Sequence, residues 1–197
     1  DGVDAWSLPR CQGLLRVDKH LWAASEQQII VLEPERGREV RRIPLPAPVA
    51  TPPTLVGKNV LLMLKSKVLI ALDANTGKEA WRLGVTAQTG RVPGRPIAAG
   101  KLVLVPHLLP TGGNDGAVLV ARRADTGAAQ WEARVSAAER PERVHQLSTI
   151  TVAGDLVLWP LRKAKRLLAL DRATGEVREA GKPVYALTFA HPHGDVL

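Results

Sequence analysis

A chain of 197 residues, 45% of them hydrophobic, can bury a sizeable core as one large domain or as a slice of a larger one. Its single cysteine, Cys11, excludes an internal disulfide framework, and no apolar run approaches the roughly 20 residues that a membrane helix needs. The formal net charge of +8 favours acidic partners without distinguishing acidic proteins, nucleic acid and anionic lipid.

Short apolar runs with a period of two, bounded by turn residues, follow one another along the chain and predict half-buried strands. In chain order we expect a lone strand within 1–8, four sets of four strands at about 10–44, 48–85, 92–135 and 144–180, and a final pair of strands at 184–197. The strands of a set are named a, b, c and d here. No segment shows a sustained 3.6-residue period, so almost no helix is expected.

The turn between strands c and d carries a repeated phrase: ALDANTGKEAW at 71–81, ARRADTGAAQW at 121–131 and ALDRATGEVRE at 169–179. A weaker copy, LEPERGREVRR, lies at 32–42, and residues 1–8 align with the end of the phrase. Four antiparallel strands per unit of about 40–50 residues are typical of a propeller blade. The predicted fold class is therefore all-β, a β-propeller with four full blades and partial blades at both ends.

Each residue type in the phrase has a structural reason. Glycine can adopt the positive φ of a tight hairpin turn, an Asp carboxylate can accept hydrogen bonds from turn N–H groups, and a Trp can pack between neighbouring sheets. The predicted structural residues of the repeat are Asp73, Thr76, Gly77, Trp81, Thr126, Gly127, Trp131, Asp171, Thr174 and Gly175.

The phrase A-L-D-x-x-T-G-x-x-x-W resembles the repeat of the pyrroloquinoline-quinone-type β-propellers. The copy at 71–81 matches it fully, whereas Arg123 stands at the Asp position of the next copy and Glu179 at the Trp position of the last. The resemblance covers most of the chain. It implies the fold, but the family includes both quinoprotein dehydrogenases and non-enzymatic members, such as the propeller lipoprotein of the outer-membrane barrel-assembly machinery.

Propellers that this repeat resembles usually have seven or eight blades. We therefore interpret residues 1–197 as a single domain that is a slice of a larger propeller; the alternative is a five-bladed ring that lacks one strand. An unclosed stack of sheets leaves exposed faces and edges, so association with the rest of the propeller, with another protein or with itself is expected.

Catalysis by this chain alone is not expected, and we assign no catalytic residue, no metal ligand and no cofactor. Resemblance to the dehydrogenases of this family would imply a calcium site, a catalytic Asp and usually a pair of adjacent cysteines. This chain has one cysteine, and Asp73, Asp125 and Asp171 lie at turns, where a structural role explains them. His191 and His193 are too few for a zinc site, and GGNDG at 112–116 lacks the Lys-Ser/Thr of a phosphate-binding loop.

Antiparallel order places the a–b and c–d turns at one rim of the blades (the turn rim) and the b–c and d–a connections at the other (the loop rim). Long, basic connections gather at the loop rim, and loops on a rigid scaffold often carry binding. The candidate partner-binding basic face comprises Lys65, Lys67, Arg91, Arg95, Arg140, Arg143, Arg162, Lys163, Lys165 and Arg166. The alternative is that each cluster is an ordinary solvated turn.

The sequence thus favours a non-catalytic propeller scaffold that binds a protein with an acidic surface, extracytoplasmic by resemblance and closest in role to the barrel-assembly propeller. A fragment of a quinoprotein dehydrogenase is the first alternative. A propeller that binds nucleic acid or another anionic ligand is the second, disfavoured for nucleic acid because no recognised motif or ladder of aromatic residues accompanies the basic residues.

Overall fold

The computed structural model describes residues 11–84, 92–108, 115–136, 138–139, 149–161 and 164–180, and these residues are almost entirely β-strand and turn. The all-β class predicted from the sequence is confirmed. The predicted partial blades at 1–8 and 184–197 lie outside the described residues. Among the described residues, no helix is long and apolar enough to cross a membrane.

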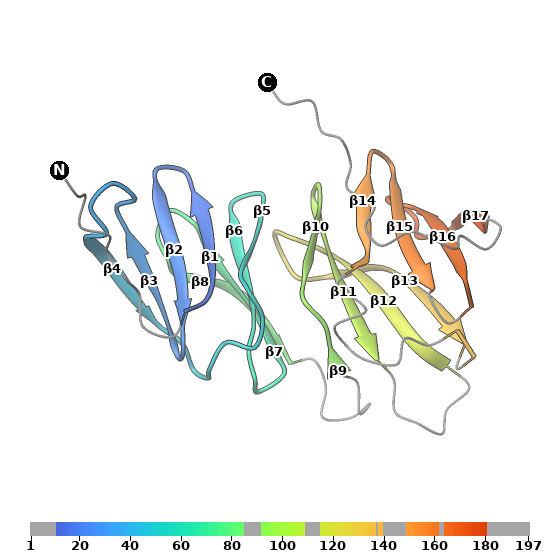
Figure 1. Cartoon of the computed structure of the whole chain (residues 1–197), viewed down its shortest axis with the longest axis horizontal. Helices are drawn as coiled ribbons and strands as arrows, with labels where there is room; N and C mark the ends of the chain where they lie inside the picture. The colour runs from blue at the N-terminus through green and yellow to red at the C-terminus, as the bar shows by residue number, and fades with distance from the viewer. Residues whose placement is uncertain are drawn as a thin grey trace. The chain divides into compact units, whose positions relative to one another are not determined.

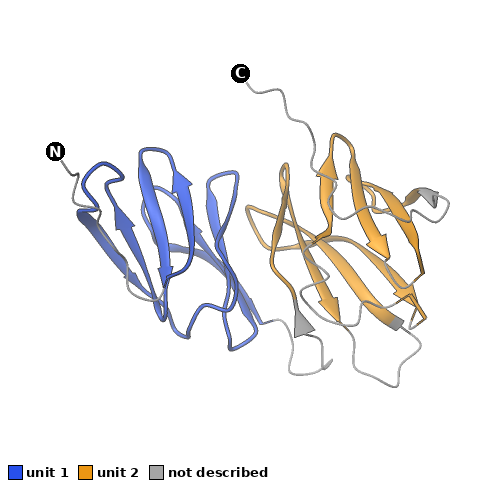
Figure 2. Ribbon diagram, viewed as in Figure 1, with its two compact units in different colours: residues 1–84 blue, residues 85–197 orange. Residues whose placement is uncertain are grey.

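Two compact units make up the chain, residues 1–84 and 85–197 (Figure 2). The first unit contains two four-stranded antiparallel sheets, each ordered as its strands occur in the chain (Figure 1). Their strands are β1 (Cys11–Val17), β2 (His20–Ser25), β3 (Gln28–Leu32) and β4 (Glu39–Pro44), followed by β5 (Thr54–Val56), β6 (Asn59–Met63), β7 (Val68–Asp73) and β8 (Glu79–Gly84).

The second unit repeats this arrangement with one addition, because the short strand β9 (Val92–Pro93) also pairs with β11. The sequence pattern did not predict this extra pairing. The remaining strands are β10 (Ile97–Ala99), β11 (Leu102–Leu108), β12 (Asp115–Arg123) and β13 (Ala129–Ser136), then β14 (Thr151–Ala153), β15 (Leu156–Leu161), β16 (Arg166–Asp171) and β17 (Val177–Ala180).

The core of each unit lies between its two sheets. In the first unit, alternate residues of β2 and β3 pack against alternate residues of β6 and β7, with Trp22 and Ile29 meeting Leu62 and Ile70 in one cluster. In the second unit, Leu104 and Leu119 share a cluster with Trp159 and Leu170. Trp22 and Trp159, both in b strands, are buried to 1% and 0% exposure, as a packing role requires.

The turn that links strands c and d has the same backbone in all four sheets. A glycine, Gly37, Gly77, Gly127 or Gly175, has a φ between 61° and 76° and donates its N–H to the carbonyl four residues earlier. Positive φ is costly for residues with a side chain, which explains the glycine. The recurring phrase therefore specifies one recurring turn.

The phrase also fixes the register of strand d against strand c. Trp81 and Trp131 occupy one register, opposite Ala71 and Ala121 of the c strand. Trp6, expected in the same register, lies outside the described residues. In the second unit the Trp131 indole donates to the carbonyl oxygen of Arg172 at 2.9 Å, in the c–d turn of the next sheet.

Close packing of this indole requires the bare glycine of the next turn. A Cβ at Gly175 would lie 2.6 Å from Trp131 ring carbons, whereas a Cβ at Gly154, in the β14–β15 turn, would meet no atom within 4 Å. Both glycines have positive φ, 76° and 57°. The two positions therefore separate backbone strain from steric exclusion.

We expect Gly154→Ala to lower the free energy of unfolding by about 1–2 kcal/mol, the cost of the left-handed backbone alone. Gly175→Ala should cost about 2–4 kcal/mol, because overpacking against the indole is added to the same strain. Urea unfolding of the two variants beside the parent chain measures the difference. Equal losses in the two variants would show that Trp131 does not pack on this turn as described.

Candidate binding surfaces at the two rims

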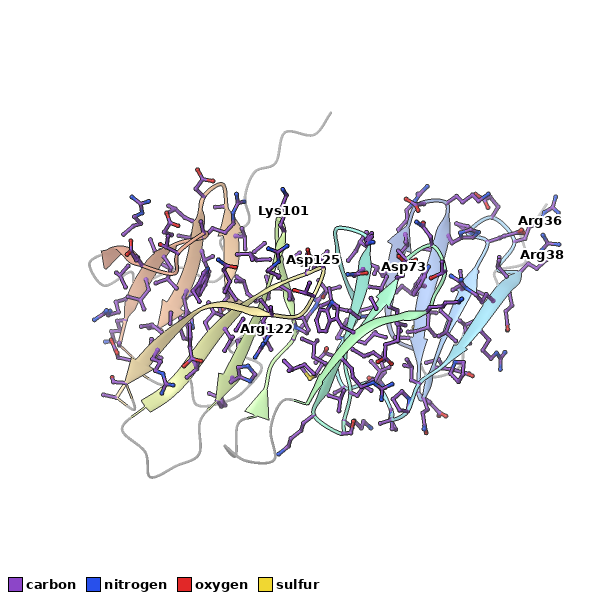
Figure 3. All side chains as sticks on the ribbon, turned by 180° about the vertical axis from the view of Figure 1, so that it is seen from behind. Arg36, Arg38, Asp73, Lys101, Arg122 and Asp125 are labelled. Atoms are coloured by element: carbon purple, nitrogen blue, oxygen red, sulfur yellow. The ribbon has the colours of Figure 1, made fainter. Side chains whose placement is uncertain are left out.

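The turn rim is held by hydrogen bonds between its two kinds of turn. The residue after the last c-strand position donates its N–H to the a–b turn of the same sheet: Ala74 to Lys58 O at 2.8 Å, Ala124 to Lys101 O at 3.0 Å and Arg172 to Asp155 O at 2.7 Å. Figure 3 labels Asp73, Lys101 and Asp125, which lie at these turns. The rim is thus a self-bonded structural layer in three of the four sheets.

Two turn carboxylates accept several hydrogen bonds from their own loops. The Asp73 Oδ1 atom accepts the N–H of Asn75 at 3.1 Å, and the N–H and hydroxyl of Thr76 at 2.8 and 2.9 Å. These bonds to the Thr76 backbone and side chain stabilise the charged form and hold the pKa of Asp73 below its ordinary value. Asp73 therefore stabilises its turn.

Asp171 is engaged in the same way, with an ion pair added. Its Oδ1 accepts the N–H groups of Ala173 and Thr174 at 2.8 and 2.9 Å, and its Oδ2 receives two N–H groups of Arg178. The bonds from Arg178, then those from the turn, lower the pKa of Asp171 to about 2. Burial of this side chain makes the turn bonds hard to replace with water.

The two sheets that depart from the phrase replace these bonds with a local ion pair. Arg123, at the expected Asp position, pairs with Asp125 at 2.7 Å, and this bond lowers the pKa of Asp125 to about 2. Glu33, in the first sheet, pairs with Arg38 at 2.6 Å. The predicted structural use of Asp125 is thus explained by a partner that the phrase itself did not indicate.

A calcium or quinone site of the dehydrogenase type would need free carboxylate and amide side chains that converge. Within the described parts of the chain, no group of three or more His, Cys, Asp or Glu residues could hold a metal ion. Asp73, Asp125 and Asp171 are engaged as above, and partly buried Cys11 bonds through Sγ to Gly13 O at 3.2 Å. The described residues therefore do not fit that group.

The loop rim shows a different character where it is described. Lys65 and Lys67, in the β6–β7 turn, are exposed, as are Arg95 before β10 and Lys165 before β16. Arg166 instead forms an ion pair with Glu139 at 3.0 Å, which reduces its availability to a partner. The other predicted members of the basic face lie outside the described residues: Arg91, Arg140, Arg143, Arg162 and Lys163.

Two of these lysines occupy the left-handed backbone region, with φ of 60° at Lys67 and 51° at Lys165. The chain places glycine at each c–d turn but lysine at these two b–c turns. The structure brings Lys65 and Lys67 together in one turn of the first unit, while Arg95 and Lys165 belong to the second unit. The convergence of the whole basic face stays a prediction.

One basic residue with a structural position was missed by the sequence analysis. Arg41 lies opposite Val31, in the register that Trp81 and Trp131 occupy in their own sheets. The signal was present, because LEPERGREVRR aligns Arg41 with those tryptophans. A weak copy of a repeat thus marks the place where the structure departs from it.

Comparisons with known proteins agree with this architecture. A family model described as outer membrane protein assembly factor BamB matches residues 12–197. Among curated proteins, nothing matches. BamB from Moraxella catarrhalis superposes with a TM-score of 0.60 at 20% identity, covering 85% of this chain and 51% of that one.

Dehydrogenases show the same likeness. Quinohemoprotein alcohol dehydrogenase ADHIIG from Pseudomonas putida HK5 superposes with a TM-score of 0.62 at 15% identity, covering 89% of this chain and 35% of that one. A europium-containing methanol dehydrogenase gives 0.61 at 19% identity, with 89% and 42% covered. This chain therefore spans about half or less of these proteins, and the β-propeller fold is what they share.

The depressed pKa of Asp171 predicts a pH dependence of stability. A lowered folded-state pKa contributes stability above the ordinary pKa of about 3.8, and the contribution is lost as the pH falls toward about 2. Asp171→Asn should therefore lower the melting temperature at neutral pH, and the gap to the parent chain should narrow below about pH 4.

Thermal unfolding of both proteins across this pH range is the measurement. Asp155→Asn is the control, because the Asp155 side chain is 93% exposed and the substitution should leave a much smaller gap at neutral pH. A gap between Asp171→Asn and the parent chain that stays constant down to about pH 2 would contradict the assigned ion pair and turn bonds.

Proposed function

The chain belongs to the family described as outer membrane protein assembly factor BamB, and from that membership we propose that it is a non-catalytic β-propeller scaffold in an assembly complex of the cell envelope. The observation that carries the proposal is the family match across residues 12–197. The proposed location is extracytoplasmic, and the proposed ligand is a protein surface. Because the chain spans 51% of the BamB structure, the partner of the whole protein is part of the proposal.

The site chemistry supports a scaffold more than an enzyme. The carboxylates that the repeat supplies are used by turns and ion pairs, as described above for Asp73 and Asp171. Bonds from the turn, and for Asp171 also from Arg178, hold the pKa of both carboxyl groups below its ordinary value, which makes them weak general bases. The repeated carboxylates of the turn rim are therefore assigned to stability, and docking of the protein partner is assigned to the loop rim.

The proposed docking surface is the basic face at the loop rim, of which Lys65 and Lys67 are the best described members in the first unit. Both side chains are exposed and separated by one residue, so an acidic surface can approach them without displacing other protein groups. Charge complementarity of this kind mainly raises association rate and specificity. The proposed partner is accordingly a protein with an acidic surface.

An enzymatic role remains the second candidate, because three quinoprotein alcohol and methanol dehydrogenases superpose with TM-scores of 0.61–0.62. These proteins are 15–19% identical to this chain, so the likeness is one of fold. Nucleic-acid binding is the third. It differs from protein docking in its salt dependence, since each phosphate contact releases counterions.

Photocrosslinking in the native host tests the docking surface. A photoreactive residue replaces Ser66, between the two lysines, and in a second protein it replaces Lys58 on the turn rim. We expect a discrete protein adduct from position 66 that position 58 does not give. The Lys65→Glu/Lys67→Glu double substitution should reduce this adduct about tenfold, whereas Lys58→Glu/Lys78→Glu should leave it unchanged.

The two double variants change the net charge equally, so a general electrostatic effect would reduce the adduct from position 66 in both of them. Identification of the crosslinked protein as an envelope assembly component supports the proposed scaffold role. Loss of the adduct in the Lys65→Glu/Lys67→Glu variant supports the basic face as the docking surface. An adduct that survives the reversal of Lys65 and Lys67 would show that the basic face of the first unit does not dock the partner.

Titration with pyrroloquinoline quinone and Ca²⁺, followed by absorbance, tests the enzymatic alternative. We expect no stoichiometric binding, because the described residues do not supply the ligand set. A quinoprotein alcohol dehydrogenase stripped of its quinone serves as the positive control. Tight binding of one equivalent by this chain would favour the dehydrogenase fragment and overturn the scaffold proposal.

A further inference from the structure

The two units solve the same packing problem with different residues. In the second unit the Trp131 indole covers the next c–d turn, with its ring on Gly175 and its N–H bonded to Arg172 O at 2.9 Å. In the first sheet of the first unit the residue in this register is Arg41. Its Nη1 donates to Asn75 O at 3.1 Å, and its guanidinium carbon lies 5.6 Å from the centroid of the Trp22 ring.

Arg41 thus keeps the hydrogen bond to the next turn but replaces a flat apolar ring with a cation. Its side chain is half-buried and lies against Gly77, where a Cβ would be 3.0 Å from the guanidinium carbon. The contact with the Trp22 ring holds the planar guanidinium group of Arg41 in place. Arginine has five N–H donors; among the described residues, the Asn75 carbonyl is the acceptor that Arg41 uses.

A second departure occurs on the same rim. Pro34 stands two residues after β3, at the position that Ala74, Ala124 and Arg172 occupy in the other sheets, because Glu33 makes the turn bond of Asp73, Arg123 and Asp171. Proline has no N–H, so the bond that ties the c–d turn to the a–b turn elsewhere cannot form here. The a–b turn of the first sheet, Asp18-Lys19, is therefore not held in the way that Lys58, Lys101 and Asp155 are.

These departures coincide with a groove in the first unit of about 570 Å³. Its walls are residues 17–20 of the β1–β2 turn, Val31, Val40, Arg41 and the Ala74–Asn75 pair of the β7–β8 turn. Val17 and Val31 are buried and form an apolar floor, whereas Lys19 and Val40 are exposed at the mouth. This volume lies within the range of small-molecule sites, about 300–1,000 Å³.

We propose that this groove is a binding site for a carboxylate attached to an apolar body. Arg41 offers the carboxylate a planar fork held from behind by Trp22, and Lys19 and His20 add donors from the facing turn. The valines and Ala74 accommodate the apolar body. Asp18 is the one acidic lining residue, and it weakens the field that the cations create.

The site lies on the turn rim, at the opposite ends of the strands from Lys65 and Lys67, so it is separate from the proposed docking surface. The repeat does not supply this site, because the fully matched phrase would place a Trp indole where the Arg41 guanidinium lies. The ligand carboxylate can come from a chain end or free acid, or from an acidic side chain within a segment. Both present the same group to Arg41.

Two matched pairs of probes test the site on the full chain by amide chemical-shift titration. N-acetyl-leucine against N-acetyl-leucinamide represents a chain end, and acetyl-Leu-Glu-Leu-amide against acetyl-Leu-Gln-Leu-amide represents an internal side chain. We expect at least one acid to shift the amide resonances of His20, Arg41 and Asn75 while its neutral partner leaves them in place. The acid that binds identifies the source of the carboxylate.

Three substitutions locate the site. Arg41→Trp installs the residue of the equivalent position 131 and should abolish binding, with affinity reduced at least about tenfold, while the fold is kept. Lys19→Gln, at an exposed position, should weaken binding about two- to threefold. Asp18→Asn should strengthen it by a similar factor, since Asn also tolerates the positive φ of 50° at this position.

The proposal is overturned if neither acid shifts these resonances, if the neutral partners bind equally well, or if Arg41→Trp binds like the parent chain. Should Arg41→Trp fail to fold, the opposed effects of Lys19→Gln and Asp18→Asn decide instead. Equal or absent effects of these two exposed substitutions would show that the carboxylate does not lie in this groove.

Discussion

Sheet stacking within each unit depends on a glycine that leaves room for a neighbour. The c–d turn needs a residue with positive φ, and the same residue must carry no side chain, because the d-strand residue of the preceding sheet lies directly on it. Gly175 under Trp131 and Gly77 under Ile43 and Arg41 meet both demands. One position therefore links the local conformation of a hairpin to the spacing of two sheets, which is why the phrase recurs while the strands around it vary.

The Asp and Thr of the phrase serve the turn alone, and this makes them replaceable. Asp73 accepts bonds from Asn75 and Thr76, whereas Arg123 reaches Asp125 instead, and the two turns keep the same backbone bonds. An exposed ion pair contributes little by itself, so the glycine conformation and the strand pairing carry most of the hairpin's stability. Carboxylates thus vary among the copies of the phrase, but the glycine does not.

The sequence predicts well those contacts that lie within a few residues. The turn of Asp73 is such a case, because its partners are two and three residues away. It predicts poorly what depends on two sheets meeting: the bond from Arg41 to Asn75 spans 34 positions, and the pair of Arg166 with Glu139 joins the start of β16 to a d–a connection. The β9 pairing lies within one sheet and was missed for another reason, since a strand of two residues carries no period.

The two rims differ in how many of their groups are already used by hydrogen bonds within the fold. At the turn rim, hydrogen bonds between turns use the backbone, so a partner that bound there would compete with the fold. The first sheet is the exception, because Pro34 removes one such bond and Arg41 replaces a covering indole with donors. Side chains at positive φ occur at Glu26, Lys67 and Lys165 in b–c turns and at Asp18 in the first a–b turn, each at a conformational cost of about 1–2 kcal/mol that glycine would avoid. The c–d turns of the four described sheets have glycine instead, because at Gly77 and Gly175 a side chain would also meet the d strand of the preceding sheet.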